Sequence, residues 1–152
     1  MSVQEILQEA IQGEVESYEL YTNAVNLVKE EHIKKTLRQL AQEELGHKAN
    51  LERMLLSPGQ LRRSVRKLQQ EPIEDHKVAD HLIVQPLGPN STFQDVCIFA
   101  SRKEQQSHEL YQGLAEQNEG EIRELFEAMA KDELRHKDLV ERWYEEVVYQ
   151  DF

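Results

Sequence analysis

The chain has 152 residues, about the size of one domain, and we expect residues 1–152 to form a single domain. Its net charge of −11 at pH 7 disfavours nucleic acid and anionic membrane surfaces as partners. The lone cysteine, Cys97, excludes an internal disulfide and a multi-cysteine metal site within one chain. The sequence also has no signal-peptide pattern and no apolar run of membrane length, so we expect no membrane partner and a cytoplasmic location.

Two helices are predicted before residue 57. The first begins at the capping box Ser2-x-x-Glu5, and the polar residues 29–32 are expected to turn the chain. The second runs to about Leu56, where Ser57-Pro58-Gly59 ends it. Apolar residues recur every three or four positions, as on a helix with one buried face. These positions are Leu7, Ala10, Tyr18, Tyr21, Val25 and Val28, then Ile33, Leu37, Leu40, Leu51 and Met54.

Residues 57–91 are the least regular part of the chain and include two short stretches with helical character. A connection of this length is too long for a tight turn and predicts a crossover along the length of a helical bundle. It carries a basic run in an otherwise acidic protein: Arg62, Arg63, Arg66 and Lys67. Such a run usually forms a solvated helix face, and the less favoured alternative is a docking site for an acidic electron donor.

A second pair of helices is predicted over residues 92–149. Ser91-x-x-Gln94 is a capping-box candidate for the third helix, and Asn118 and Gly120 mark the turn into the fourth. The apolar positions of the third helix are Phe93, Cys97, Ala100, Tyr111 and Leu114, and those of the fourth are Ile122, Leu125, Met129, Val140, Trp143 and Val147.

The two helix pairs are copies of one another. Glu14 and Tyr21 match Glu104 and Tyr111 at an offset of 90, and Glu44 with His47 matches Glu133 with His136 at an offset of 89. The one-residue difference falls in the turn. Two repeated helical hairpins, 2–56 and 92–149, joined by the crossover predict an all-α four-helix bundle.

Six polar residues occupy positions where the helices should present core side chains. They are Glu14, Glu44, His47, Glu104, Glu133 and His136. Each lies near the middle of its helix, so antiparallel packing brings all six to one level. One Glu from each of two helices and Glu-x-x-His from each of the other two is the ligand pattern of a carboxylate-bridged two-metal site in a bundle.

The donor set and the charge suggest which metals the site takes. Oxygen ligands with one imidazole per ion suit iron or manganese, and four carboxylates balance two divalent ions. We expect two iron ions, or manganese or a mixed pair, with Glu44 and Glu133 bridging them. Glu14 and Glu104 would be terminal ligands, and His47 and His136 would each bind one ion.

Several neighbours of the six residues are predicted to support them. A ligating histidine usually donates its second ring N–H to a fixed acceptor, so we expect Asp132 to support His47 and Glu43 to support His136. Tyr21 and Tyr111 lie two turns beyond Glu14 and Glu104. They either hydrogen-bond a ligand carboxylate, supply a proton during O–O cleavage, or are plain bundle core.

This set of motifs resembles the ferritin-like superfamily, and most closely its rubrerythrin branch. The resemblance covers the four helices and implies a di-iron or di-manganese centre that reacts with dioxygen or hydrogen peroxide. Typical rubrerythrins also carry a four-cysteine rubredoxin-like domain, which the sequence does not show, so we expect an external electron-donor protein. They also carry an extra carboxylate on the third helix, whereas Ser101 and Ser107 stand three residues either side of Glu104.

The leading functional hypothesis is therefore a non-haem di-iron oxidoreductase of peroxidase or oxidase type, acting as a homodimer. The first alternative is a ferroxidase or iron-handling protein, in which oxidised iron moves on from the site. The second is a helical bundle that binds metal only for structure.

Overall fold

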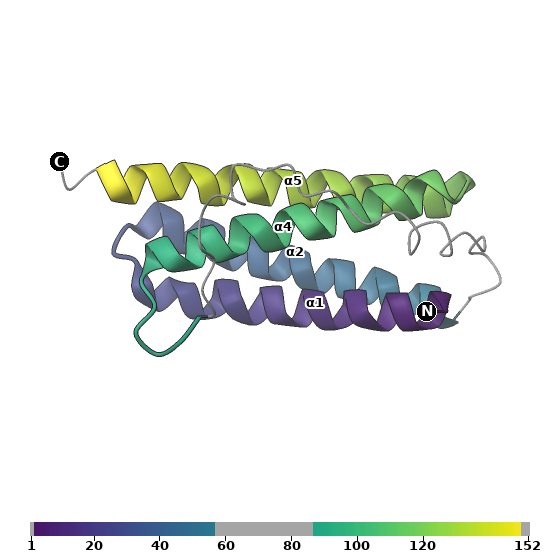
Figure 1. Cartoon of the computed structure of the whole chain (residues 1–152), viewed down its shortest axis with the longest axis horizontal. Coiled ribbons are helices and arrows are strands. Elements are labelled where there is room, and N and C mark those ends of the chain that lie inside the picture. The colour runs from purple at the N-terminus through teal and green to yellow at the C-terminus, as the bar shows by residue number, and fades with distance from the viewer. Residues whose placement is uncertain (1, 57–86, 150–152) are drawn as a thin grey trace.

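The computed structural model describes residues 2–56 and 87–149, which form four long helices and no strand within those ranges. The helices are α1 (Val3–Ala24), α2 (Glu31–Leu56), α4 (Phe93–Glu116) and α5 (Gly120–Tyr149), with a short 3-10 helix η1 (Val25–Leu27) after α1 (Figure 1). The predicted all-α four-helix bundle is confirmed. The residues assigned to the crossover lie outside the described ranges, apart from 87–91.

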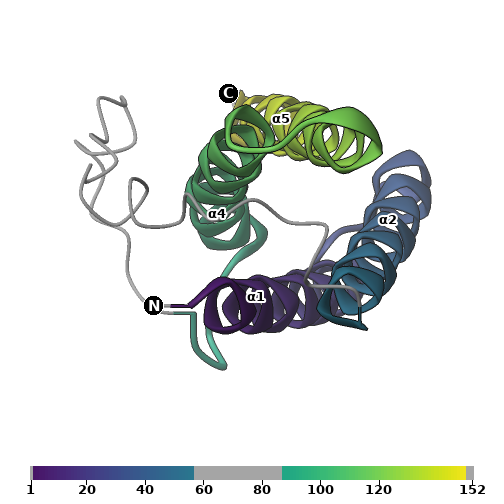
Figure 2. The ribbon, with the colours of Figure 1, turned by 90° about the vertical axis from the view of Figure 1, so that its right-hand side faces the viewer.

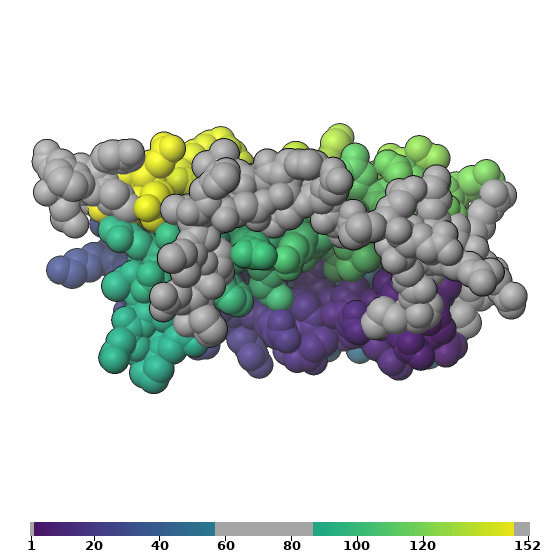
Figure 3. Space-filling view, in the orientation of Figure 1, coloured from purple at the N-terminus to yellow at the C-terminus, as the bar shows by residue number. Residues whose placement is uncertain are grey.

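The bundle consists of two antiparallel hairpins, α1–α2 and α4–α5. Each hairpin packs closely along its length, whereas contacts between the hairpins are sparser and are made mainly by α1 with α4. Seen along the bundle, the order of helices around the interior is α1, α2, α5, α4 (Figure 2). In the middle of the face shown in Figure 3, the green atoms of α4 lie directly against the purple atoms of α1. No helix in the described ranges is long and apolar enough to cross a membrane.

The helix ends follow the sequence with two corrections. The capping box of α1 is present, with Glu5 N donating to Ser2 Oγ at 3.1 Å and Ser2 N donating to Glu5 Oε2 at 3.3 Å. The capping box predicted at Ser91 and Gln94 is wrong by one residue, because Thr92 caps α4 together with Asp95. The Ser91 hydroxyl instead accepts a hydrogen bond from Gly88 N at 2.8 Å and closes the preceding turn.

The first interhelical turn also lies earlier than predicted. Helix α1 ends at Ala24, the chain turns over residues 25–30, and α2 begins at Glu31, so His32 is helical. No Gly or Pro marks this turn; Val28, in extended conformation, is buried against the core. The second turn is at the predicted place, and Gly120 has φ of +66°, which glycine adopts without strain.

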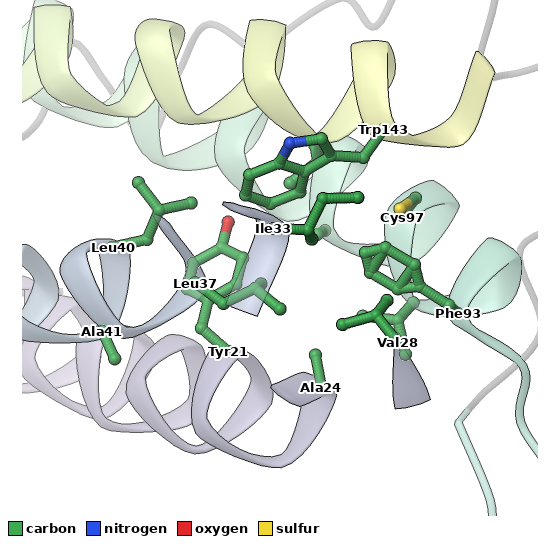
Figure 4. Close-up of a cluster of buried hydrophobic side chains, with 13 residues drawn as sticks. Tyr21, Ala24, Val28, Ile33, Leu37, Leu40, Ala41, Phe93, Cys97 and Trp143 are labelled. Carbon is green, nitrogen blue, oxygen red and sulfur yellow. The ribbon is translucent and has the colours of Figure 1, made fainter. Parts of the chain in front are cut away.

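The apolar interior is divided into two clusters at opposite ends of the bundle. The first apolar cluster surrounds the α1–α2 turn and the start of α4, with Leu37 and Trp143 among its members (Figure 4). The second apolar cluster, which includes Leu7 and Phe126, lies near the α4–α5 turn. Phe126 is fully buried although the predicted stripe passed through Leu125, which is only half-buried. Between the clusters the interior is polar.

Candidate metal centre

The six polar residues predicted at core positions are all buried, and none is more than 4 % exposed. They come from all four helices, with α1 and α4 each contributing one Glu and α2 and α5 each contributing a Glu-x-x-His pair. The helical spacing of three places each Glu and His one above the other on the same face. The complete set is Glu14, Glu44, His47, Glu104, Glu133 and His136.

Ligand atoms of the six residues form two overlapping groups, in each of which the atoms lie within 4.8 Å of one another. One group is Glu14, Glu44, His47 and Glu133, and the other is Glu44, Glu104, Glu133 and His136. Glu44 and Glu133 belong to both groups. The geometry thus agrees with the predicted bridging pair, while the role of each residue as a ligand remains a prediction.

Each histidine turns its Nδ1 atom toward three carboxylates. His47 Nδ1 lies 2.9 Å from Glu133 Oε1, 3.5 Å from Glu14 Oε1 and 3.7 Å from Glu44 Oε1. His136 Nδ1 lies 3.1 Å from Glu44 Oε1, 3.6 Å from Glu104 Oε2 and 4.0 Å from Glu133 Oε1. Neighbouring ligands about 2.1 Å from one ion and at right angles to each other are about 3 Å apart, so these spacings suit shared cations.

Most of the buried polar atoms of the six residues lack the hydrogen-bond partners that buried polar atoms usually have. In the described part of the chain, nine buried side-chain N and O atoms have no hydrogen-bond partner, and all nine belong to the six residues. They include both carboxylate oxygens of Glu44 and of Glu133 and the Nδ1 atoms of both histidines. Burying such atoms without partners is costly, and bound cations would satisfy them. The donor set therefore fits two divalent ions.

Without bound cations, the pKa values of two of the buried carboxylates are raised, because burial and neighbouring carboxylates disfavour their negative charges. Burial, reinforced by the charge of Glu44, raises the pKa of Glu14 to about 7. Burial and the neighbouring Glu104, Glu44 and Glu14 raise the pKa of Glu133 well above its usual range. Without cations the cluster would therefore retain protons to reduce the repulsion among its carboxylates.

The pKa values of the two histidines are also raised, but for a different reason. Burial opposes their charged forms, but the surrounding carboxylates outweigh it and raise the pKa of His47 to about 9 and of His136 to about 10. Since a ligating histidine must be neutral, metal binding has to expel these protons.

One of the two predicted supporting contacts is present and the other is not. His47 Nε2 lies at hydrogen-bond distance, 2.9 Å, from Asp132 Oδ2, as predicted. Glu43 Oε1 is 3.7 Å from His136 Nε2, too far for a hydrogen bond. The same oxygen of Glu43 accepts a hydrogen bond from Arg135 Nη2. The predicted support of His136 by Glu43 is thus wrong, because an arginine takes the carboxylate.

Both tyrosines bind carboxylates, but across the bundle. Tyr21 on α1 donates to Glu104 Oε1 on α4, and Tyr111 on α4 donates to Glu14 Oε1 on α1, each at 2.5 Å. Of the three roles considered for the tyrosines, the hydrogen bond to a carboxylate of the cluster is present, and each bond links one hairpin to the other. Burial and nearby carboxylates raise the pKa of both phenols well above 10, so they act as donors.

Three further residues behave as ordinary structure. His108 Nδ1 donates to the backbone oxygen of Ala130 at 2.7 Å, and Ser101 Oγ donates to Glu141 Oε1 at 2.8 Å. Cys97 is buried in the first apolar cluster, and burial raises the pKa of its thiol to about 12.

The basic run in the crossover lies outside the described residues. Sequence reasoning did not single out Arg135, although it differs from its repeat partner, Gly46, and that difference was its signal.

Fold and site together define a four-helix bundle with a buried carboxylate–histidine cluster suited to a pair of metal ions. The family model described as Rubrerythrin matches residues 5–80 and 98–151, which is most of the chain. The chain therefore belongs to the rubrerythrin family, within the ferritin-like superfamily.

One solved structure, a hypothetical protein from Pyrococcus furiosus, is similar with a TM-score of 0.68 and 21 % sequence identity. The similarity covers 99 % of this chain and 92 % of that one, and at this identity it supports the fold alone. A comparison with curated proteins gave no match.

Proposed function

We propose that this protein is a carboxylate-bridged di-iron or di-manganese oxidoreductase that reacts with hydrogen peroxide or dioxygen. One observation carries the proposal: every buried side-chain N or O atom without a partner in the described residues belongs to the same six residues. A merely structural core would satisfy or avoid such atoms. Membership of the rubrerythrin family supports the same reading.

The six residues divide into two positions that share a pair of carboxylates. Glu14 and His47 would hold one ion, Glu104 and His136 the other, and Glu44 and Glu133 would bridge both. When bound in its reduced form, the metal pair would supply the two electrons that reduce hydrogen peroxide to two water molecules. An external donor protein would return those electrons between turnovers.

The chain itself would supply orientation, exclusion of water and protons. The two apolar clusters close the centre at both ends of the bundle. Each tyrosine would fix the orientation of one terminal carboxylate through its 2.5 Å hydrogen bond. Each phenol keeps its proton while the carboxylates are uncompensated, and a basic oxygen atom formed from the substrate could take up that proton once bound cations neutralise the carboxylates that raise the phenol pKa.

Anaerobic loading followed by peroxide titration tests this function. Protein loaded with two equivalents of Fe(II) should be oxidised completely by one equivalent of hydrogen peroxide, since each peroxide takes two electrons and two protons. A Glu133→Gln variant should bind less iron and show no such end point. Iron that stays reduced would favour a structural metal, and oxidised iron that leaves the protein after each cycle would favour iron handling.

A further inference from the structure

The two halves of the centre are related by the internal repeat, and one exchange breaks their equivalence. The segment Glu43-Glu44-Leu45-Gly46-His47 on α2 corresponds to Asp132-Glu133-Leu134-Arg135-His136 on α5. Acid, ligand Glu, leucine and histidine are retained in both. The fourth place holds glycine in one copy and arginine in the other.

On the glycine side the histidine has a charged acceptor. Asp132 Oδ2 lies 2.9 Å from His47 Nε2, the ring atom facing away from the cluster. No cationic side chain in the described ranges pairs with Asp132, because the residue in the place corresponding to Arg135 is Gly46. Within the described part of the chain, no cation competes with the imidazole for this carboxylate.

On the arginine side the equivalent contact is missing. Arg135 donates to Glu43 Oε1, and that oxygen stays 3.7 Å from His136 Nε2. His136 is completely buried, and neither of its ring nitrogens has a hydrogen-bond partner. The arginine thus both neutralises the acceptor and holds it away from the ring.

An acceptor hydrogen-bonded to the outer nitrogen of a ligating imidazole fixes the tautomer and the orientation of the ring, and the loss of such a partner weakens metal binding. We infer that Arg135 makes the two metal positions unequal, so that the His47 position binds a divalent ion more tightly and fills before the His136 position. This inference rests on the proposed metal-binding function. Arg135 is a positioning residue, because it acts only through Glu43.

The size of the effect follows from the contact that is lost. Removing such an outer hydrogen-bond partner typically changes metal affinity roughly 10- to 100-fold, so a difference of at least about 10-fold between the positions is expected. The Arg135–Glu43 pair is partly exposed, with side chains 49 % and 33 % accessible. Salt should weaken it, and the difference should shrink as ionic strength rises.

The difference between Gly46 and Arg135 can be altered by substitution at either position. Arg135→Gln should release Glu43 and bring the two affinities closer together. Gly46→Arg should place a cation beside Asp132 and weaken the His47 position, and a Cβ at Gly46 would meet nothing within 4 Å. Arg123→Gln is the matched control, because Arg123 is similarly exposed at 48 % and pairs with Glu127 on the outer surface.

The test is a Zn(II) titration of the full chain, stripped of metal, followed by ¹H–¹⁵N correlations of the two imidazole rings. The His47 signals should shift during the first equivalent and the His136 signals during the second, in the wild type and in Arg123→Gln. Arg135→Gln, and high salt in the wild type, should bring the two transitions together. Rings that shift together in the wild type, or a separation unchanged by Arg135→Gln, would overturn the inference. Rings that do not respond to Zn(II) at all would overturn the proposed function with it.

Discussion

The ends of the bundle and its middle are built on opposite principles. At the ends, side chains from the four helices bury apolar surface in two clusters, which is the ordinary source of stability in a helical bundle. In the middle, the same helix faces bury four carboxylates and two imidazoles whose polar atoms lack partners. The ends therefore form the frame, and the middle is the candidate metal centre, whose unpartnered charges should weaken the fold unless cations neutralise them.

The tyrosines form the boundary between these regions. Tyr21 belongs to the first apolar cluster and Tyr111 to the second, yet the hydroxyl of each reaches a carboxylate of the centre. Each ring is thus packed in the apolar frame while its polar end holds a predicted ligand. Changes at the ends, in the middle and at this boundary should therefore have different consequences.

The largest effect is expected from losing a carboxylate shared by both positions. Glu44→Ala and Glu133→Ala should each abolish loading of both ions, because each residue belongs to both groups of ligand atoms. Glu52→Ala, at an exposed site on the same helix as Glu44, is the control and should leave loading unchanged. Metal content after reconstitution and desalting measures this. Two full equivalents retained by either variant of the centre would contradict the assignment.

A large cavity at one end should affect stability without affecting loading. Phe126→Ala removes a fully buried ring of the second apolar cluster and should lower the free energy of unfolding by about 3–5 kcal/mol. Leu134→Ala, at a 45 % exposed position of α5, should change it by less than about 0.5 kcal/mol. Urea unfolding and metal content measure both quantities. A Phe126→Ala variant that folds but binds no metal would show that frame and site are not separable.

The polar centre should make the metal-free protein less stable as the solution becomes more alkaline. The pKa of Glu14 rises from 4.5 to about 7 on folding, and those of His47 and His136 rise from 6.5 to about 9 and about 10. The folded state therefore holds protons that the unfolded chain releases, and stability should fall as pH rises from about 5 to 9. The Glu14 shift alone corresponds to a loss on the order of 3 kcal/mol between pH 4.5 and 7.

Unfolding of metal-stripped protein at pH 5, 7 and 9 checks this, with loaded protein as the reference. Because loading expels the same protons, apparent metal affinity should rise over that pH range. Stripped protein that is as stable as the loaded form at pH 7, or more stable at pH 9 than at pH 5, would show that the buried carboxylates do not strain the fold.

The smallest effect is expected at the boundary. Tyr21→Phe removes the hydroxyl that donates to Glu104 and should cost about 1–3 kcal/mol, with little change in ring packing. Tyr18→Phe is the matched control, one turn earlier on α1, and should be close to neutral. Thermal unfolding measures both. Equal effects for the two variants would mean that Tyr21 is plain core.

The fold and the six central residues could be predicted because helical periodicity reports which side chains face the interior. Glu44 and His47 fall in the same register as Leu40 and Leu51, and the repeat then locates their counterparts. Periodicity does not report which neighbouring helix a side chain reaches. The cross-hairpin bonds of the tyrosines and the capture of Glu43 by Arg135 depend on packing between helices that are far apart in sequence. Periodicity predicts Leu125 as the core residue where Phe126 is the buried one, because two adjacent apolar residues leave the helical register ambiguous.

The most direct test of the central claim is anomalous diffraction from crystals of protein loaded with Fe(II) under anaerobic conditions. We expect two iron peaks within the bundle, both next to Glu44 and Glu133, with one beside His47 and the other beside His136. A single peak, or iron bound only at the acidic outer surface, would contradict it.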